Sequence, residues 1–425
     1  MLSALGVVPF RRFWTTVVLA MLGYAIQTFA LGYYIVQLAV RAGTPELGSF
    51  YLGVVGVAQV IPSLLLGAFG GVLADRVDRR RTLVTTESVM LVSFVILTTL
   101  IVTDRFSIAA GAGLSMVQGT VFALGQPARQ SLVPNLVPRE RLVSAIGMNS
   151  AAYNATTFIG PLIAGVLFVP LGLNGLFWLT CALEVAAVIT LLLALPHLHV
   201  PRVAAVRSGV WRSLADGLAY AWRDRITRWT LILFGTAAFF VREYAALLPA
   251  VSERVLHVGA VELSWMLSAS GAGALAGTIT TATLAHVERR GRLLVICAAS
   301  MGALLAALAL QTTLVGAIVF VAALAFTTLL FVGMTNTILQ VRTPDAMRGR
   351  ILSLPSLSYG VLGPVGLLTF GTLGTAIGID RALLVGGILF VMVAAFAFLN
   401  AAELWRASVR PGMPKDVPEI VVAGD

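Results

Sequence analysis

The chain has 425 residues, of which 58% are hydrophobic and 11% are charged, and its formal net charge is +10. This composition excludes an ordinary soluble protein and indicates an integral membrane protein. The positive charge does not indicate a nucleic-acid partner, because the basic residues are spread over many short segments between apolar runs.

Twelve apolar runs are long enough to cross about 30 Å of hydrocarbon as helices. They lie at residues 12–40, 48–73, 82–103, 107–128, 142–169, 173–196, 229–251, 263–285, 293–313, 314–338, 352–379 and 382–405. The short links predict helical hairpins, because open backbone is not tolerated in lipid. We therefore expect an all-α integral membrane fold with twelve transmembrane helices.

The first run is too long for the apolar region of a signal peptide, and it lacks a clear small-residue cleavage site, so we expect a retained helix. If the N-terminus is inside, few of the 29 basic residues lie on the outer side. Those on the outer side are Arg41, Arg105, Arg254 and Arg381. This asymmetry predicts that both termini are cytoplasmic.

A charged hairpin, Gly-Val-Leu-Ala-Asp-Arg-Val-Asp-Arg-Arg-Arg at residues 71–81, separates the second and third runs. It resembles the loop between the second and third helices of the major facilitator superfamily and matches five of that pattern's six positions. The departure is Asp78, where the pattern has glycine. In that family the loop is associated with closing the cytoplasmic side. The resemblance therefore implies a conformational latch made of Gly71, Asp75, Arg76 and Arg79.

Asp75 would be favoured near the positive end of the eleventh run, around residues 353–356. The alternative is that the hairpin arginines only enforce topology, and we prefer that interpretation for Arg80 and Arg81.

The link after the fourth run reads Gln-Pro-Ala-Arg-Gln-Ser-Leu-Val-Pro-Asn-Leu-Val-Pro-Arg-Glu over residues 126–140. This block resembles the enterobactin-exporter and macrolide-efflux branch of the superfamily, and the resemblance extends over residues 9–405. It implies a monomeric exporter in the bacterial inner membrane. It also implies that proton entry drives the export of drugs, siderophores or similar amphipathic molecules.

The fifth run carries small residues at positions of the superfamily's antiporter signature. Gly147, Gly160, Pro161 and Gly165 match four of its six positions, which favours exchange over symport. Independently of the family, small residues let helices approach closely and a proline bends a helix. A merely well-packed helix would show the same glycines.

An internal repeat divides the chain into two halves. An offset of 210 residues carries Gly67 onto Gly277 and Pro134 onto Pro344. We expect two pseudo-symmetric six-helix bundles at residues 1–196 and 229–405, a cytoplasmic connector at 197–228 and a flexible cytoplasmic tail at 406–425. Apolar residues from Trp211 to Trp229 recur at helical spacing in the connector. This spacing favours either an amphipathic helix on the inner leaflet or a plain linker helix.

Charged side chains inside apolar runs are costly in lipid, which makes them candidates for function. Arg242 and Glu243 fall within the seventh run, which lines the cavity in the family's architecture, and Glu184 falls in the middle of the sixth. We expect Glu243 to be the first candidate for proton coupling, Glu184 the second, and Arg242 a partner or anion-binding group. The alternative for the adjacent pair is an outer gate salt bridge with partners elsewhere in the chain. Glu87 lies near the inner surface, and we expect it to pair with the hairpin arginines.

Polar and aromatic residues of other runs suit an amphipathic ligand through stacking and hydrogen bonds. The candidates for a substrate cavity are Tyr24, Gln27, Tyr34, Gln118 and Asn336. Some of the aromatic residues would equally suit anchoring at the membrane interface.

We expect no enzyme activity, cofactor or metal, because the sequence has no metal-binding histidine pair on a helix, no nucleophile elbow and no phosphate loop. The expected partners are a small amphipathic substrate, protons and membrane lipid. A lipid or lysolipid flippase of the same fold is the alternative within transport. A membrane receptor or scaffold is the alternative of another class, and the intact hairpin argues against it.

Overall fold

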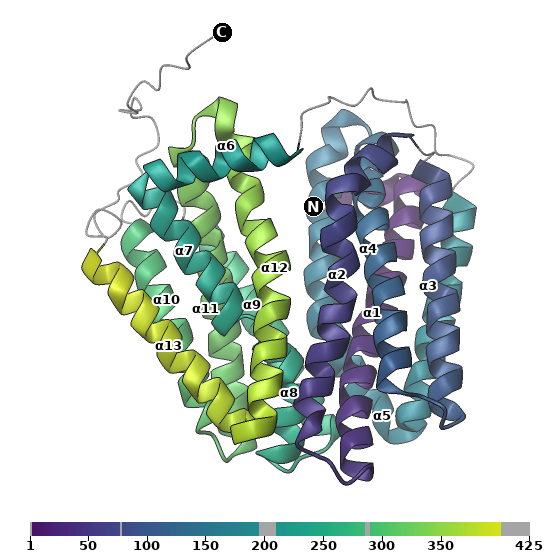
Figure 1. The fold of residues 1–425 in the computed structure, drawn as a ribbon. Helices are drawn as coiled ribbons and strands as arrows, with labels where there is room; N and C mark the ends of the chain where they lie inside the picture. Colours follow the sequence, from purple (N-terminus) through teal and green to yellow (C-terminus); the bar gives the residue numbers. More distant parts are fainter. Residues whose placement is uncertain (1, 77–78, 195–209, 285–289, 401–425) are drawn as a thin grey trace.

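The computed structural model describes residues 2–76, 79–194, 210–284 and 290–400, which are helical almost throughout and contain no strand (Figure 1). The first half begins with a short 3₁₀ helix, η1 (Leu2–Gly6). It continues with α1 (Val8–Arg41), α2 (Leu47–Arg76), α3 (Arg79–Val102), α4 (Ile108–Leu136), the 3₁₀ turn η2 (Arg139–Arg141) and α5 (Leu142–Ala194).

The second half begins with α6 (Val210–Arg223) in the predicted connector. It continues with α7 (Arg225–Phe240), α8 (Tyr244–Arg254), α9 (Ala260–Thr283), α10 (Arg290–Ala309), α11 (Leu314–Arg342), α12 (Asp345–Ile377) and α13 (Ile379–Asn400).

The predicted fifth and sixth runs form one helical stretch, α5, that reverses direction across a kink. Gly172 at the kink has φ 64° and ψ −178°, a conformation that a glycine adopts without the steric cost of a side chain. The two halves of α5 therefore cross the membrane separately, as the twelve-helix prediction requires.

In the described part of the chain, ten helical stretches are long and apolar enough to cross a membrane. The α5 stretch contains two of the expected crossings, and α7 with α8 forms one stretch. The helix α9 is not among the ten, although it lies in the predicted eighth run. It carries many Gly, Ser and Thr residues, which suit close packing against α5 and α11.

Figure 1 shows two groups of helices, α1 to α5 and α7 to α13, with α6 lying across one end of the second group. We call this the α6 end, and the end with the loop at residues 42–46 the opposite end. The two groups face each other through α2 against α12, α5 against α9 and α1 against α8. The predicted all-α fold of two six-helix bundles is confirmed.

The bundles are joined near the opposite end. Ser49 on α2 donates a hydrogen bond to the backbone oxygen of Gly371 on α12 at 3.1 Å, and this contact is buried. Gln37 on α1 donates to the carboxylate of Glu253 on α8 at 2.7 Å. Close packing of small residues supports these bonds, since a Cβ on Gly53 would lie 3.1 Å from the Cα of Leu368.

The helix α6 is held against the second bundle by ion pairs. Arg350 on α12 donates to Asp216 on α6 at 3.1 Å. Arg342 at the end of α11 donates at 3.1 Å to Asp224, which directly follows α6 and caps α7. Trp222 on α6 is 66% exposed, so part of its apolar surface has no protein cover. This exposure suits the inner-leaflet interpretation of the connector, which stays a prediction.

Candidate functional site

A cavity of about 510 Å³ lies between the two bundles. Helices α1, α2, α4 and α5 line it from the first bundle, and α8, α9 and α12 from the second. This volume is in the range of small-molecule sites. Its wall is mostly apolar and aromatic, and its polar lining consists of amides and hydroxyls rather than charged side chains.

Three of the predicted cavity residues line this space: Tyr24, Gln27 and Gln118. Tyr24 accepts a hydrogen bond from the side-chain amide of Gln59 at 2.6 Å and stacks on Phe122, with ring centroids 6.2 Å apart. These contacts join α1 to α2 and α4 and fix the orientation of the tyrosine ring.

The amide groups of the cavity differ in how their polar atoms are satisfied. The amide of Gln118 donates to the hydroxyl of Ser93 at 3.0 Å, so this group is engaged within the bundle. Gln27 is 2% exposed, and its buried carbonyl oxygen has no hydrogen-bond partner among the described residues. A buried acceptor without a partner is costly. Gln27 therefore offers an unused acceptor to a ligand with a donor group.

Tyr34 and Asn336, also predicted for the cavity, do not line it. Tyr34 lies about 10 Å along α1 from Gln27, towards the closed opposite end. It packs edge-on against Phe106 and Phe177 there, with centroids 5.2 Å and 6.4 Å away. Asn336 is exposed on α11, a helix that contributes none of the described lining residues because α8, α9 and α12 stand there instead.

The seventh predicted run is broken at the residues that carry its charges. The helix α7 ends at Phe240 and α8 begins at Tyr244, and the amides of Val241 and Arg242 both bond to the backbone oxygen of Ala237 at 3.0 Å. No proline or glycine at residues 238–244 signals this break in the sequence. The expectation of one continuous helix through Arg242 and Glu243 was therefore wrong.

The break between α7 and α8 places both charged side chains against α12. The guanidinium of Arg242 lies 4.2 Å from the ring centroid of Tyr359, and its buried Nε atom has no hydrogen-bond partner in the described structure. The carboxylate of Glu243 lies beside Tyr359 and against Gly363, where a Cβ would be 2.9 Å from its Oε1 atom. Neither charge lines the cavity, but Ala245, in the next turn, does.

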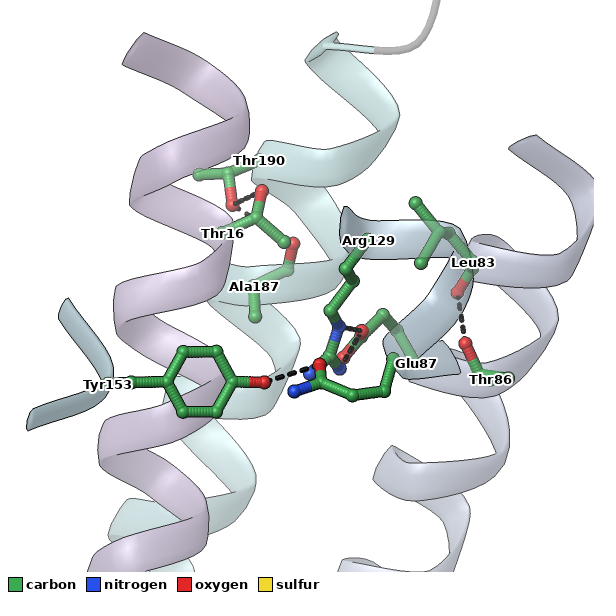
Figure 2. A network of polar contacts seen from close by, with 9 residues as sticks. Thr16, Leu83, Thr86, Glu87, Arg129, Tyr153, Ala187 and Thr190 are labelled. Atoms are coloured by element: carbon green, nitrogen blue, oxygen red, sulfur yellow. Dashed lines mark hydrogen bonds and ion pairs between the residues drawn. The ribbon is translucent and has the colours of Figure 1, made fainter. Parts of the chain in front are cut away.

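A second group of charges is buried inside the first bundle (Figure 2). Arg129 on α4 donates from Nε to Oε1 of Glu87 on α3 at 3.1 Å, and its terminal nitrogen binds the same oxygen. The carboxyl group of Glu184 on α5 lies against that of Glu87. Glu87 was expected to pair with the hairpin arginines, and the structure corrects this, because the side chain turns inward to α4.

The sequence did not indicate that Arg129 pairs with a buried acid, although this residue lies within the distinctive block at residues 126–140. Tyr153 on α5 points towards the same place in Figure 2 and donates a hydrogen bond to Gln126 on α4. Because Tyr153 also lines the cavity, it lies between the cavity and the buried charges.

The antiporter-like residues of α5 have different surroundings. A Cβ on Gly160 would lie 2.5 Å from the Cβ of Ala25 on α1, and one on Gly165 would overlap Ser264 on α9. Pro161 lines the cavity, whereas Gly147 has open space around its Cα. Gly160 and Gly165 thus permit close helix contacts, and Gly147 does not have that role here.

The predicted latch falls at the ends of α2 and α3. Gly71, Asp75 and Arg76 lie in the last turns of α2, and Arg79 begins α3. Their side chains lie outside the described part of the structure, as do the backbones of residues 77–78. The contact expected between Asp75 and residues 353–356 therefore stays a prediction.

Comparison with known proteins agrees with this architecture. Residues 2–420 match the family described as transmembrane secretion effector. The chain is 27% identical over 353 residues to the enterobactin exporter EntS of Citrobacter koseri, covering 82% of this chain and 83% of that protein. It is 23% identical over 340 residues to the multidrug efflux pump Tap of Mycolicibacterium fortuitum, covering 78% and 82%. The structure of the nucleoside transporter NupG (D323A mutant) superposes with a TM-score of 0.72 at 12% identity, over 92% of this chain and 99% of that one.

Proposed function

Because the chain belongs to the transmembrane secretion effector family of the major facilitator superfamily, we propose that it exports amphipathic small molecules across the bacterial inner membrane in exchange for protons. It is a membrane transporter rather than an enzyme. The observation that carries the substrate proposal is the cavity of about 510 Å³ between the bundles. Its aromatic wall suits the apolar part of such a molecule, and Gln27 offers it a hydrogen-bond acceptor.

The transport step in this proposal is alternating access by rocking of the two bundles. We place the α6 end and both termini in the cytoplasm, following the distribution of basic residues. The contacts at Ser49 and Gln37 then close the outer side, which corresponds to an inward-facing state. We propose that Gly71, Asp75, Arg76 and Arg79 close the cytoplasmic side when the protein turns outward.

Proton coupling requires a buried acid that changes its protonation between the two states. Glu243 and Glu184 are the acids that we propose, and Arg242 is the partner of Glu243. Support for Glu243 comes from its place at the helix break, next to the cavity-lining Ala245. Support for Glu184 comes from its burial inside the first bundle, where it is 1% exposed.

A lipid flippase is not favoured by the relatives or by the cavity. The two relatives described above are named for enterobactin export and for multidrug efflux, and the described cavity carries no charged residue that would receive a lipid headgroup.

The test is cellular retention of a panel of amphipathic dyes and antibiotics in an efflux-deficient bacterium, with and without a protonophore. Expression of the wild-type protein should lower retention, and the protonophore and Glu243→Gln should each restore it. Asp75→Asn should slow export by impairing closure, whereas Glu140→Gln, at an exposed acid of η2, should leave it unchanged. Retention that the wild-type protein does not lower for any compound would contradict the proposal.

A further inference from the structure

Three helices of the first bundle bring ionisable side chains to one depth. Glu87, Arg129 and Glu184 lie about 12, 10 and 15 Å from the α6 ends of α3, α4 and α5, at the helical rise per residue. They are 1%, 7% and 1% exposed. Charged groups buried in this way are costly unless they pair, so the cluster needs a balanced charge.

The cluster contains two carboxyl groups and one guanidinium. Arg129 binds Oε1 of Glu87 with two nitrogens, while Oε2 of Glu87 and Oε1 of Glu184 are buried without a hydrogen-bond partner among the described residues. The other titratable side chains that interact with the cluster there are Tyr153, beside Arg129, and Cys181, beside Glu184. Neither side-chain type can carry a positive charge.

Two carboxylates in contact cannot both remain ionised when one cation is available to them. We propose that Glu87 and Glu184 share a single proton beside Arg129, and that this pair binds and releases a second proton during transport. The shared proton follows from the contacts of these three side chains, and the pair's part in transport rests on the proposed function. Glu87 and Arg129 then belong to the coupling machinery together with Glu184.

The neighbours of the cluster provide a route to the cavity. Tyr153 lines the cavity and donates a hydrogen bond to Gln126, which lies one helical turn before Arg129 on α4. A substrate seated against Tyr153 would hold this turn, and with it the guanidinium, against Glu87. When Arg129 moves away from Glu87 in the empty outward-facing protein, the pair binds a second proton from the outer side. When Arg129 returns to Glu87 in the inward-facing protein, that proton is released to water at the α6 end, so one proton enters for each substrate that leaves.

Infrared spectroscopy of the purified full-length protein in lipid nanodiscs tests the shared proton without a substrate. The wild-type protein should show the carbonyl band of a protonated carboxylic acid at neutral pH. Glu87→Gln and Glu184→Gln should each abolish this band, because the remaining carboxylate then balances Arg129. Arg129→Gln should increase the band about twofold, because both acids then bind protons. Glu140→Gln should leave it unchanged.

A wild-type protein without this band, or a band that survives in both glutamine variants, would overturn the shared proton. A band lost only in Glu243→Gln would do the same. Circular dichroism and gel filtration identify variants that do not fold. Glu184→Asp keeps the carboxyl group, so it should retain the band with a shifted frequency and titration, and this variant keeps the test decisive where a glutamine variant unfolds.

Proteoliposomes with an imposed pH gradient and ethidium as the probe test the coupling. Glu184→Gln should abolish the dependence of ethidium movement on the gradient and retain downhill movement, whereas Glu140→Gln should retain both. Gradient-driven movement by Glu184→Gln would overturn the coupling role. If the wild-type protein moves no ethidium, the proposed function fails for this probe, while the infrared result still decides whether the proton is shared.

Discussion

Arg242 lies against an aromatic ring at the helix break. Its guanidinium lies 4.2 Å from the ring centroid of Tyr359, and its Nε atom lacks a hydrogen bond in the described structure. A cation over an aromatic face gains electrostatic energy, and the gain increases when water is excluded. The ring therefore offsets part of the cost of placing Arg242 inside the protein.

Replacing Tyr359 tests this contact. Tyr359→Leu should lower stability by about 0.5–2 kcal/mol, because the aromatic face is lost. Tyr359→Phe keeps the face and should cost less. The measurement is the thermal midpoint of the detergent-solubilised protein for both variants beside the wild type. Equal midpoints for the phenylalanine and leucine variants would show that the ring does not stabilise Arg242.

Residues that look alike in the sequence have different surroundings in the structure. Polarity made both Gln27 and Asn336 candidates for the substrate cavity, yet only Gln27 lines it, because the depth of a residue and the rotation of its helix decide which side chains face the cavity. Glu87 and Glu184 come from separate helices, and no local pattern places their carboxyl groups in contact. The sequence could predict that the buried charges were unusual, but their partners depend on how the helices pack.

At the scale of elements, glycines set how closely helices of different bundles approach. A Cβ on Gly165 of α5 would overlap Ser264 of α9, and one on Gly271 of α9 would lie 2.5 Å from the Cα of Phe158. The same helix α5 also carries Gly147, which has open space around it. These two glycines of one helix therefore form a matched pair for mutation.

Gly165→Ala should destabilise the closed opposite end by about 1–3 kcal/mol, because the added methyl group overpacks the contact with α9. Gly147→Ala should be neutral or slightly stabilising, since alanine has the higher helix propensity. Thermal midpoints measure both effects. The double variant Gly165→Ala with Ser264→Gly should recover part of the loss. A Gly165→Ala midpoint equal to that of Gly147→Ala would refute the packing argument.

The docking of the junction between α6 and α7 should depend on pH through Asp224, the N-cap of α7. Burial alone would raise the pKa of this carboxyl group, but hydrogen bonds from Arg342 and Thr227 outweigh burial and lower its pKa below the ordinary value. A lowered pKa means that the contact stabilises the docked state fully above the unfolded pKa, near 4, and loses this contribution as the pH falls through the folded value.

Acidification below about pH 4 should therefore loosen the end of α6 next to Asp224 from α11, because protonated Asp224 no longer pairs with Arg342. Asp224→Asn should loosen this end of α6 already at neutral pH while keeping a side chain that can cap α7. Hydrogen exchange of the residue 210–223 segment measures the loosening. Exchange that is independent of pH in the wild type would argue against the ion pair as the docking contact.

Hydropathy predicted the number of crossings, since each apolar run must span the same thickness. It could not predict the break between α7 and α8, where no proline or glycine marks the end of the helix. The amphipathic spacing predicted α6 within the connector, and the ion pairs that dock it to α11 and α12 link residues far apart in the chain. Local patterns thus predicted the elements, and tertiary contacts determined how they are interrupted and held.

At the scale of the whole molecule, the contacts between bundles lie towards one end. Ser49 binds Gly371 and Gln37 binds Glu253 near the opposite end, and the two helix groups diverge towards the α6 end in Figure 1. Alternating access requires these contacts to break while new ones form at the α6 end.

Spin-label distances should therefore change reciprocally. One label pair occupies the exposed positions Gln130 and Gln340 near the α6 end, and the other occupies Arg105 and Leu310 near the opposite end. When the protein turns outward, the first distance should shorten and the second lengthen. Pulsed electron resonance in nanodiscs across pH measures both. Two distances that change together, or neither changing at any pH, would contradict rocking of rigid bundles.

The most direct test of proton-driven export is movement of a dye against its own gradient. Purified protein in proteoliposomes, given a pH gradient and equal ethidium on both sides, should accumulate ethidium on the acidic side and lose this accumulation when an ionophore collapses the gradient. Accumulation should be absent in Glu184→Gln. Dye accumulation that is insensitive to the ionophore, or no accumulation by protein whose label distances change with pH, would contradict the account of proton-coupled export.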